Sequence, residues 1–408
     1  MTTATRSPEH PATPRPDATP ERPGSPSAPL APDTPVITGW SAVSPYGLTR
    51  RAFAEGLRSG ARTAVEPDAA YGPLPSPEVC LVPGFDIKGL LGPTGTSKMD
   101  RLTALTLVAS DGLLNDAEGN RVVATDERTG VVLGISMGSL ENVTNFLKQS
   151  YTNALPFHVD AGRIPFGSLN HAAGATAIRH GLTGPNTTVA GGRVSGLLAL
   201  NYARRLLGQG RATRYLVGSA EEFSAAHAWF EHAAVAPGDP APLLGEGCGL
   251  LVVEPAGSAE RPALAAVLAV ETRVDVDDDP GAAVTACVQR ALARAGATAE
   301  EVWAAVPSAA PTAAGRAEQA ALAALLPAEA LTAVPSMTLL GDTSAASATF
   351  QIQALLAVAE TDPAAAGRTV LVTAVDRDGA VGCTVLRLLD PHRAPHRDTH
   401  RNPDRDAA

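Results

Sequence analysis

Short apolar runs alternate with helical hydrophobic patterns along most of the chain. Runs of strand length lie at 36–38, 130–136, 215–218, 249–254, 264–270, 302–306, 369–375 and 381–388. Apolar residues spaced for one face of a helix lie at 102–115, 194–207, 281–295, 316–326 and 345–359. Strands that alternate with helices predict an α/β protein with helices covering the sheet. The pattern restarts after Pro255, which indicates a duplicated core.

The two ends of the chain lack this pattern. Residues 1–33 are rich in Pro, Thr, Ser and Ala, and residues 391–408 are polar with His and Arg interleaved. Neither segment has enough large apolar side chains to offset the entropy of ordering, so we expect a disordered arm and a frayed tail. The remaining chain divides into an N-terminal half, 34–255, and a C-terminal half, 256–390.

The composition excludes some classes of partner. Hydrophobic residues make up 45% of the 408 residues, enough for a sizeable core. The net charge is -10 and the globular part has no basic tract, which argues against nucleic acid or an anionic membrane as the main partner. An acidic protein partner would require a local basic patch, which a sequence cannot show.

The cysteines give no sign of a metal site. Cys80, Cys248, Cys287 and Cys383 are isolated, without a C-x-x-C pair or a His at ligand spacing. We therefore expect no metal, no cofactor and no disulfide framework, with Cys248 a small buried hydrophobe. Free cysteines, the lack of an apolar run of about 20 residues and the lack of a signal peptide favour a cytoplasmic protein.

Five motifs, in order along 34–390, resemble the β-ketoacyl synthase family. They are VITGWSAVSPYG at 36–47, GPNTTVAGGRVSG at 184–196, LVGSAEE at 216–222, GEGCGLLVVE at 245–254 and SMT at 336–338. Each motif is weak alone, but their order makes the match specific. The resemblance implies a thiolase-like fold, in which a duplicated βαβαβ core is layered α/β/α/β/α.

The resemblance also shows which chemistry is missing. The family uses a Cys nucleophile on a sharp turn at a helix N-terminus, where the helix dipole lowers the thiol pKa. Matched through Val189 and Gly196, that position is Arg193. A guanidinium has no nucleophilic lone pair at cellular pH, so acyl transfer cannot occur there. Family members that only decarboxylate carry Gln at this position, and Arg departs from that pattern as well.

The two catalytic histidines of the family are also absent. No His stands between His232 and His392, and the matching motifs place Pro307 and Gly341 at the expected positions. The family's Gly-Phe-rich gating turn is replaced by Asp-Arg-Asp-Gly at 376–379. Glu318 matches a buried family glutamate, for which we expect a structural role.

The stretch VAGGRVSG at 189–196, followed by EEFS at 221–224, looks most like the chain length factors of type II polyketide synthases, which are scaffolds without the thiol and imidazoles. The resemblance implies a heterodimer with a catalytic ketosynthase, which works on chains carried by an acyl carrier protein. This subunit would supply part of the acyl tunnel wall and so set chain length. Our candidate wall residues are Met137, Leu140, Val143, Phe146, Ile164 and Phe166, any of which could instead be ordinary core.

Several alternatives stay open at this point. The chain could be a stand-alone decarboxylase or acyltransferase that uses unfamiliar residues, or a scaffold with no present role. Arg193 could pair across an interface, contact carrier phosphate, or plug the obsolete pocket. Whether the product is aromatic or a reduced polyene is not decided by the sequence.

Overall fold

The computed structural model describes residues 30–390. The disorder predicted for residues 1–29 and 391–408 concerns segments outside the described residues. The last four residues of the predicted arm, 30–33, are described, and the carbonyl of Pro32 accepts a hydrogen bond from the amide of Gly257.

Nine strands and ten α-helices make up the described chain. The strands are β1 (Pro35–Val43), β2 (Thr129–Ile135), β3 (Asn186–Ala190), β4 (Arg214–Glu221), β5 (Gly247–Pro255), β6 (Ala265–Val274), β7 (Val302–Val306), β8 (Thr369–Val375) and β9 (Ala380–Leu388). The helices are α1 (Arg50–Ser59), α2 (Ile87–Leu91), α3 (Arg101–Leu114), α4 (Leu140–Thr152), α5 (His171–His180), α6 (Ser195–Gly208), α7 (Ala225–Ala233), α8 (Pro280–Ala295), α9 (Ala313–Leu325) and α10 (Ser347–Ala359).

Each strand and helix expected from the hydrophobic pattern is present. The pattern did not reveal several shorter helices, among them α1, α5 and α7. Helix α1 buries only Phe53 and Leu57 of its ten residues, so its apolar stripe is too narrow to stand out. In the part of the chain that the structure describes, none of the helices combines the length and apolar character needed to cross a bilayer.

The sheet order shows the duplication. The strands run β3-β2-β4-β5-β1-β6-β9-β8-β7. In the first half β2 is parallel to β4, and β4, β5 and β1 are then antiparallel in turn. The second half repeats this arrangement as β7, β8, β9 and β6. The two halves join through two residue pairs between β1 and β6.

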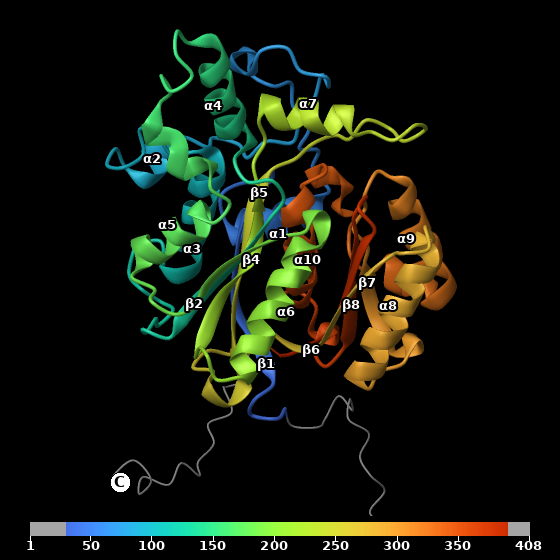
Figure 1. The fold of residues 1–408 in the computed structure, drawn as a ribbon. Coiled ribbons are helices and arrows are strands. Elements are labelled where there is room, and N and C mark those ends of the chain that lie inside the picture. The colour runs from blue at the N-terminus through green and yellow to red at the C-terminus, as the bar shows by residue number, and fades with distance from the viewer. Residues whose placement is uncertain (1–29, 391–408) are drawn as a thin grey trace, which may run out of the picture.

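The helices form layers on either side of the sheet (Figure 1). Helices α3 and α5 cover the outer face of the first half, where Leu105 and Leu133 belong to one apolar cluster. Helices α8 and α9 cover the outer face of the second half in the same way. Helices α6 and α10 lie between the two halves, in a third cluster centred on residues such as Leu200 and Phe350. The predicted α/β/α/β/α layering is therefore confirmed.

Helix α10 is held to both halves by two glutamines. Gln353 donates through Nε2 to the carbonyls of Ser41 and Leu250, at 2.7 and 3.2 Å. Gln351 donates to the carbonyls of Val306 and Thr373, at 2.8 and 2.9 Å. Residues two apart on a helix point in nearly opposite directions, so one side chain reaches β1 and β5 while the other reaches β7 and β8.

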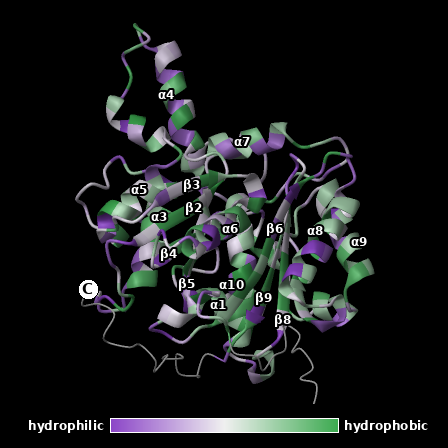
Figure 2. Ribbon diagram, turned by 60° about the horizontal axis from the view of Figure 1, so that its bottom comes forward, coloured by the Kyte–Doolittle hydropathy of each residue, from purple (hydrophilic) through white to green (hydrophobic). Residues whose placement is uncertain are grey.

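One side of the molecule is left uncovered. Strand β3 is the first strand of the sheet and has a neighbour on one side only. Helix α4 projects from the body of the molecule, as Figures 1 and 2 both show. Large apolar side chains on α4 and the segment after it are exposed, including Tyr151 at 85% and Phe157 at 72%. Exposed apolar side chains beside an open sheet edge are typical of an interaction surface.

Candidate functional site

The turn between β3 and α6 carries the residue at the expected nucleophile position. After β3 ends at Ala190, a short 3-10 helix, η3 (Gly192–Val194), leads into α6. Gly192 has a φ of +52°, and a Cβ there would collide with the carboxylate of Asp376. The Ser195 hydroxyl donates to the Ile135 carbonyl and accepts from the Gly191 amide, which ties the turn to β2.

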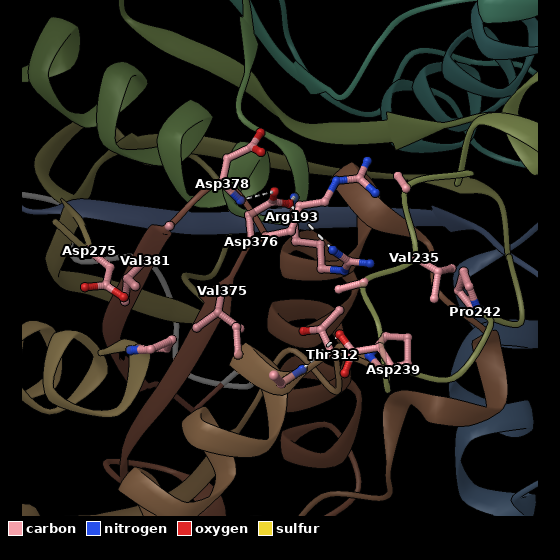
Figure 3. Close-up of a pocket in the computed structure, with 18 of the residues that line it drawn as sticks. Arg193, Val235, Asp239, Pro242, Asp275, Thr312, Val375, Asp376, Asp378 and Val381 are labelled. Atoms are coloured by element: carbon pink, nitrogen blue, oxygen red, sulfur yellow. Dashed lines mark hydrogen bonds and ion pairs between the residues drawn. The ribbon is translucent and has the colours of Figure 1, made fainter. Parts of the chain in front are cut away.

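Arg193 is buried on this turn and forms its ion pairs within the chain. Its side chain binds Asp342 in a bidentate manner through Nε and Nη2. Asp376 accepts the Arg193 backbone amide at 2.8 Å, and its Oδ2 lies 3.7 Å from Nη1 (Figure 3). Although burial opposes the charged form, these carboxylates raise the pKa of Arg193 above its ordinary value. These contacts fit the plug among the roles left open for Arg193, and the choice between those roles stays a prediction.

A second ion pair continues from the turn between β8 and β9. Arg377 binds Glu231 of α7 in a bidentate manner, at 2.7 and 2.8 Å. The imidazole of His227 lies 3.8 Å from the same carboxylate. Burial opposes the charged form of Glu231, but His227 and Arg377 hold its pKa at about 2. The pKa of His227, which burial alone would lower, is raised to about 9 by Glu231 and Glu221.

These groups surround a cleft of about 600 Å³. Arg193 lies at the cleft with Asp376 and Arg377, and the walls come from the segments around Val235, Val276 and Thr312 (Figure 3). Among the described residues that line it, there is neither a Cys nor a His. Both guanidiniums at the cleft are held by carboxylates, and a buried arginine cannot act as a base or nucleophile. The cleft therefore lacks the side chains that acyl transfer requires.

The structure brings the two expected histidine positions together. Pro307 follows β7, and its neighbour Ser308 lines a small cavity of about 20 Å³ with Gly341 and Asp342. Glu318 is fully buried and accepts hydrogen bonds from the hydroxyls of Ser308 and Thr373. Glu318 thus fastens the segment after β7 to β8, which supports the structural role expected for it.

The G-E-G segment at 245–247, which leads into β5, has a structural role. Glu246 has no exposed surface and accepts two hydrogen bonds from Arg101, at 2.6 and 2.5 Å. Its oxygens also accept the backbone amides of Val82 and Phe223. The side chain therefore joins α3, β5 and the segment after β4, and takes no part in the cleft.

Comparison with known proteins gives the family. The Beta-ketoacyl synthase, N-terminal domain, family matches residues 34–259, more than half of the chain. The chain belongs to the β-ketoacyl synthase family. The 3-oxoacyl-[acyl-carrier-protein] synthase 2 of Synechocystis is 29% identical over 194 residues, which cover 46% of this chain and 45% of that protein. This relative is thus matched over less than half of its length.

Two solved structures of ketosynthases are also similar. One, described as the ishigamide ketosynthase/chain length factor, has a TM-score of 0.87 and 78% identity over 88% of this chain and 100% of that chain. The other, a type II PKS acyl-carrier protein in complex with its ketosynthase bound to the hexaketide, has a TM-score of 0.72 and 18% identity, with coverage of 88% and 100%. The second likeness shows the fold alone. The thiolase-like fold predicted for this ketosynthase-family chain is confirmed.

The six candidate tunnel residues lie apart from the cleft. Met137 follows β2, and Leu140, Val143 and Phe146 lie on α4. Ile164 and Phe166 lie on η2 (Ala161–Gly167), which packs beside α4. Phe146 and Ile164 are exposed in this chain, at 37% and 54%, and the other four are half-buried. None of the six lines the cleft over Arg193.

A buried carboxyl lies at the base of α4. Glu222 is 2% exposed, and its oxygens accept the Ser139 hydroxyl and the Leu102 amide, each at 3.0 Å. Ser139 is the N-terminal cap residue of α4. Burial, and then the nearby negative charge of Asp100, raise the pKa of Glu222 to about 8. Glu222 is therefore largely protonated at neutral pH.

Sequence reasoning named Arg193 but not its partners. Asp342 and Asp376 stand in the two motifs that departed from the family pattern, one beside Gly341 and one at the gating turn. A buried cation requires nearby carboxylates. The presence of Asp342 and Asp376 in the two altered motifs could therefore have predicted that they pair with Arg193. His227, Glu231 and Arg377 gave no such signal, because nothing in the sequence brings α7 to the β8–β9 turn.

Replacing Arg193 by Met should destabilise the folded protein by about 3–5 kcal/mol, because Asp342 and Asp376 would be left buried without a cation. The triple variant Arg193→Met/Asp342→Asn/Asp376→Asn should recover most of this loss. Urea unfolding measures both, with Arg51→Met on the exposed face of α1 as control. An Arg193→Met protein as stable as the control would show that the ion pairs of Arg193 with Asp342 and Asp376 do not contribute to the free energy of unfolding.

The Glu222 carboxyl should make stability depend on pH. The folded state keeps its proton up to about pH 8, whereas the unfolded state loses it near pH 4.5. Between these values the unfolded state binds fewer protons, so stability falls as pH rises, by on the order of a few kcal/mol. Glu222→Gln should remove this part of the slope in denaturant unfolding from pH 5 to 8.5, and exposed Glu118→Gln should not. Equal slopes for Glu222→Gln and wild type would contradict the assignment.

Proposed function

We propose that this chain is the non-catalytic, chain length factor subunit of a type II polyketide synthase. It pairs with a catalytic ketosynthase that supplies the Cys and both His, and together they elongate a chain held on an acyl carrier protein. The observation that carries this proposal is Arg193, buried and held by Asp342 and Asp376 at the expected nucleophile position. A stand-alone condensing enzyme or acyltransferase needs a nucleophile at that turn.

Similarity to a solved structure supports the same conclusion. The ketosynthase/chain length factor of ishigamide contains a chain to which this one is 78% identical over that chain's full length. That description names a ketosynthase and a chain length factor. Because the present chain has Arg193 instead of a thiol, it fits the chain length factor of the two.

The uncovered side of the molecule supports a partner subunit. The open edge of β3 and the exposed apolar side chains of α4 are the surfaces that a second ketosynthase-fold chain would cover. Pairing of β3 with its counterpart would continue the sheet across the interface. The candidate tunnel residues on α4 and η2 lie on this same side, where a partner would enclose them.

The size of the enclosed side chains would then limit the product. A wall residue such as Phe146 or Phe166 leaves room for a fixed number of methylenes, because close-packed cavities resist further atoms.

We also infer a cytoplasmic location for the assembly. All four cysteines are buried and unpaired, and burial raises the pKa of Cys248 to about 12, which fits a structural thiol in a reducing compartment.

Co-expression with the ketosynthase of the same biosynthetic system should give a stable heterodimer on gel filtration. Mass spectrometry after loading with acyl carrier protein should find acyl groups on the ketosynthase and none on this chain. The chain expressed alone should be poorly soluble or inactive, since its apolar side is uncovered. A chain that is soluble alone and does not bind the ketosynthase would contradict the proposal. A covalent acyl adduct on this chain would contradict it as well.

Replacing bulky side chains of the candidate tunnel wall by Ala should enlarge the tunnel and lengthen the product. In the reconstituted heterodimer, Phe146→Ala and Phe166→Ala should each shift products toward longer chains, read by liquid chromatography and mass spectrometry. Tyr202→Ala is the matched control, because Tyr202 is an exposed aromatic residue of α6, outside both the candidate wall and the apolar surface of α4. Unchanged product length in both variants would remove Phe146 and Phe166 from the tunnel wall.

A further inference from the structure

Helix α4 and η2 bury little of their own surface. Of the 13 residues of α4, Asn142 alone is buried, and η2 has no buried residue. A helix of a globular protein normally takes most of its stability from an apolar face packed against the core. We call residues 139–167 the α4–η2 segment, which projects from the body of the molecule (Figure 1). Its position must therefore depend on contacts other than a packed apolar face.

Two polar contacts join the α4–η2 segment to the start of α3. At the N-terminal cap of α4, the Ser139 hydroxyl donates to Glu222 at 3.0 Å, and the same carboxyl group accepts the backbone amide of Leu102. Before η2, Asp160 accepts the ammonium of Lys98 at 2.7 Å. Within residues 30–390, no other side-chain hydrogen bond or ion pair joins the segment to the remaining chain. Both of its ends are thus held at one place in the body.

Contacts inside the segment connect these two anchors. Asn142, in the first turn of α4, donates through Nδ2 to the Ser139 hydroxyl at 2.9 Å, and its Oδ1 accepts Nη1 of Arg163 at 3.2 Å. The Nε of Arg163 lies 3.5 Å from Oδ2 of Asp160. The polar contacts therefore form a closed path from α3 through α4 and η2 and back to α3. We call its six side chains the polar ring: Lys98, Ser139, Asn142, Asp160, Arg163 and Glu222.

The polar ring lies beside candidate wall residues of both elements. Asn142 precedes Val143 on α4, and Arg163 precedes Ile164 on η2. The two elements also touch there, because a Cβ at Gly167 would lie 3.6 Å from Cγ2 of Val143. Hydrogen bonds have a narrow range of length and angle, whereas half-buried apolar side chains can slide past one another. The contact between Asn142 and Arg163 is therefore suited to fix the spacing of α4 and η2.

We propose that Asn142 and Arg163 are positioning residues, which hold α4 and η2 at one spacing and so make the product chains uniform in length. The proposal rests on the proposed function, in which α4 and η2 form part of the acyl tunnel. Neither side chain has to touch the acyl chain, because Asn142 is 5% exposed and the guanidinium of Arg163 is held by Asn142 and Asp160. A smaller wall residue lengthens the product, whereas a variable spacing gives a mixture of lengths.

The test compares Arg163→Leu with Arg163→Lys in the reconstituted heterodimer, with products read by liquid chromatography and mass spectrometry. The Arg163 side chain is 41% exposed, so both variants should fold. Arg163→Leu removes the donor to Asn142 and should raise the share of products of other lengths several-fold. Arg163→Lys keeps a cationic donor and should restore much of the uniformity.

The matched control is Arg58→Leu, which makes the same change on the exposed face of α1. It should leave the distribution of product lengths as it is in the wild type. A distribution that Arg163→Leu does not broaden, or that the control broadens as much, overturns the proposal.

Hydrogen exchange reads the position of the segment without reference to the product. Amides of α4 and η2 should exchange faster in Arg163→Leu than in the wild type or the control, whereas those of α3 and β4 should not change. Unchanged exchange in α4 and η2 would overturn the positioning role. Exchange is measured in whatever assembly the chain forms, so a wild type that yields no product counts against the proposed function alone. Uniform products from an Arg163→Leu heterodimer with faster exchange count against this inference alone.

Discussion

A guanidinium taken out of water must be matched by carboxylates, and this requirement organises the region where the β3–α6 turn meets the second half of the chain. Arg193 is 5% exposed, and its partners come from two distant segments, Asp342 before α10 and Asp376 after β8. Burying any one of these three charges without the others would cost several kcal/mol of desolvation free energy that no ion pair would offset. The turn, the segment before α10 and the β8–β9 connection are therefore constrained by one another, in the place where an active ketosynthase needs reactive groups.

The scaffold around this network is retained because its supports lie elsewhere. Gly192 still adopts the left-handed conformation of the tight turn, and Ser195 still fastens that turn to β2. Glu246 and Glu318 hold the segments behind the cleft through hydrogen bonds that do not involve Arg193. A fold whose supports are independent of the reactive groups can keep its shape when those groups are replaced, which explains how a ketosynthase scaffold accommodates Arg193 at the turn.

The sequence carried enough information for the fold, and it shows directly that no Cys or His stands at the expected positions. Buried strands such as β8 and apolar helices such as α10 have hydrophobic patterns that packing alone determines. Arg193 could be found because the surrounding motif fixes its register. The ion partners of Arg377 and the polar ring around Asn142 could not be found, because they depend on how α4, α7 and η2 meet other elements in space. The candidate tunnel residues on α4 and η2 remain a prediction, because a hydrophobic pattern alone does not distinguish a tunnel wall from ordinary core.

The two glutamines of α10 have a consequence for how the molecule behaves as a whole. A duplicated architecture could in principle melt in two stages, one for each repeat. Here the central helix donates from Gln353 to strands of the first repeat and from Gln351 to strands of the second. Separating either repeat from the helix would break these hydrogen bonds and expose the apolar cluster that α6 and α10 share with both halves. We therefore expect the two repeats to unfold together, although the architecture is duplicated.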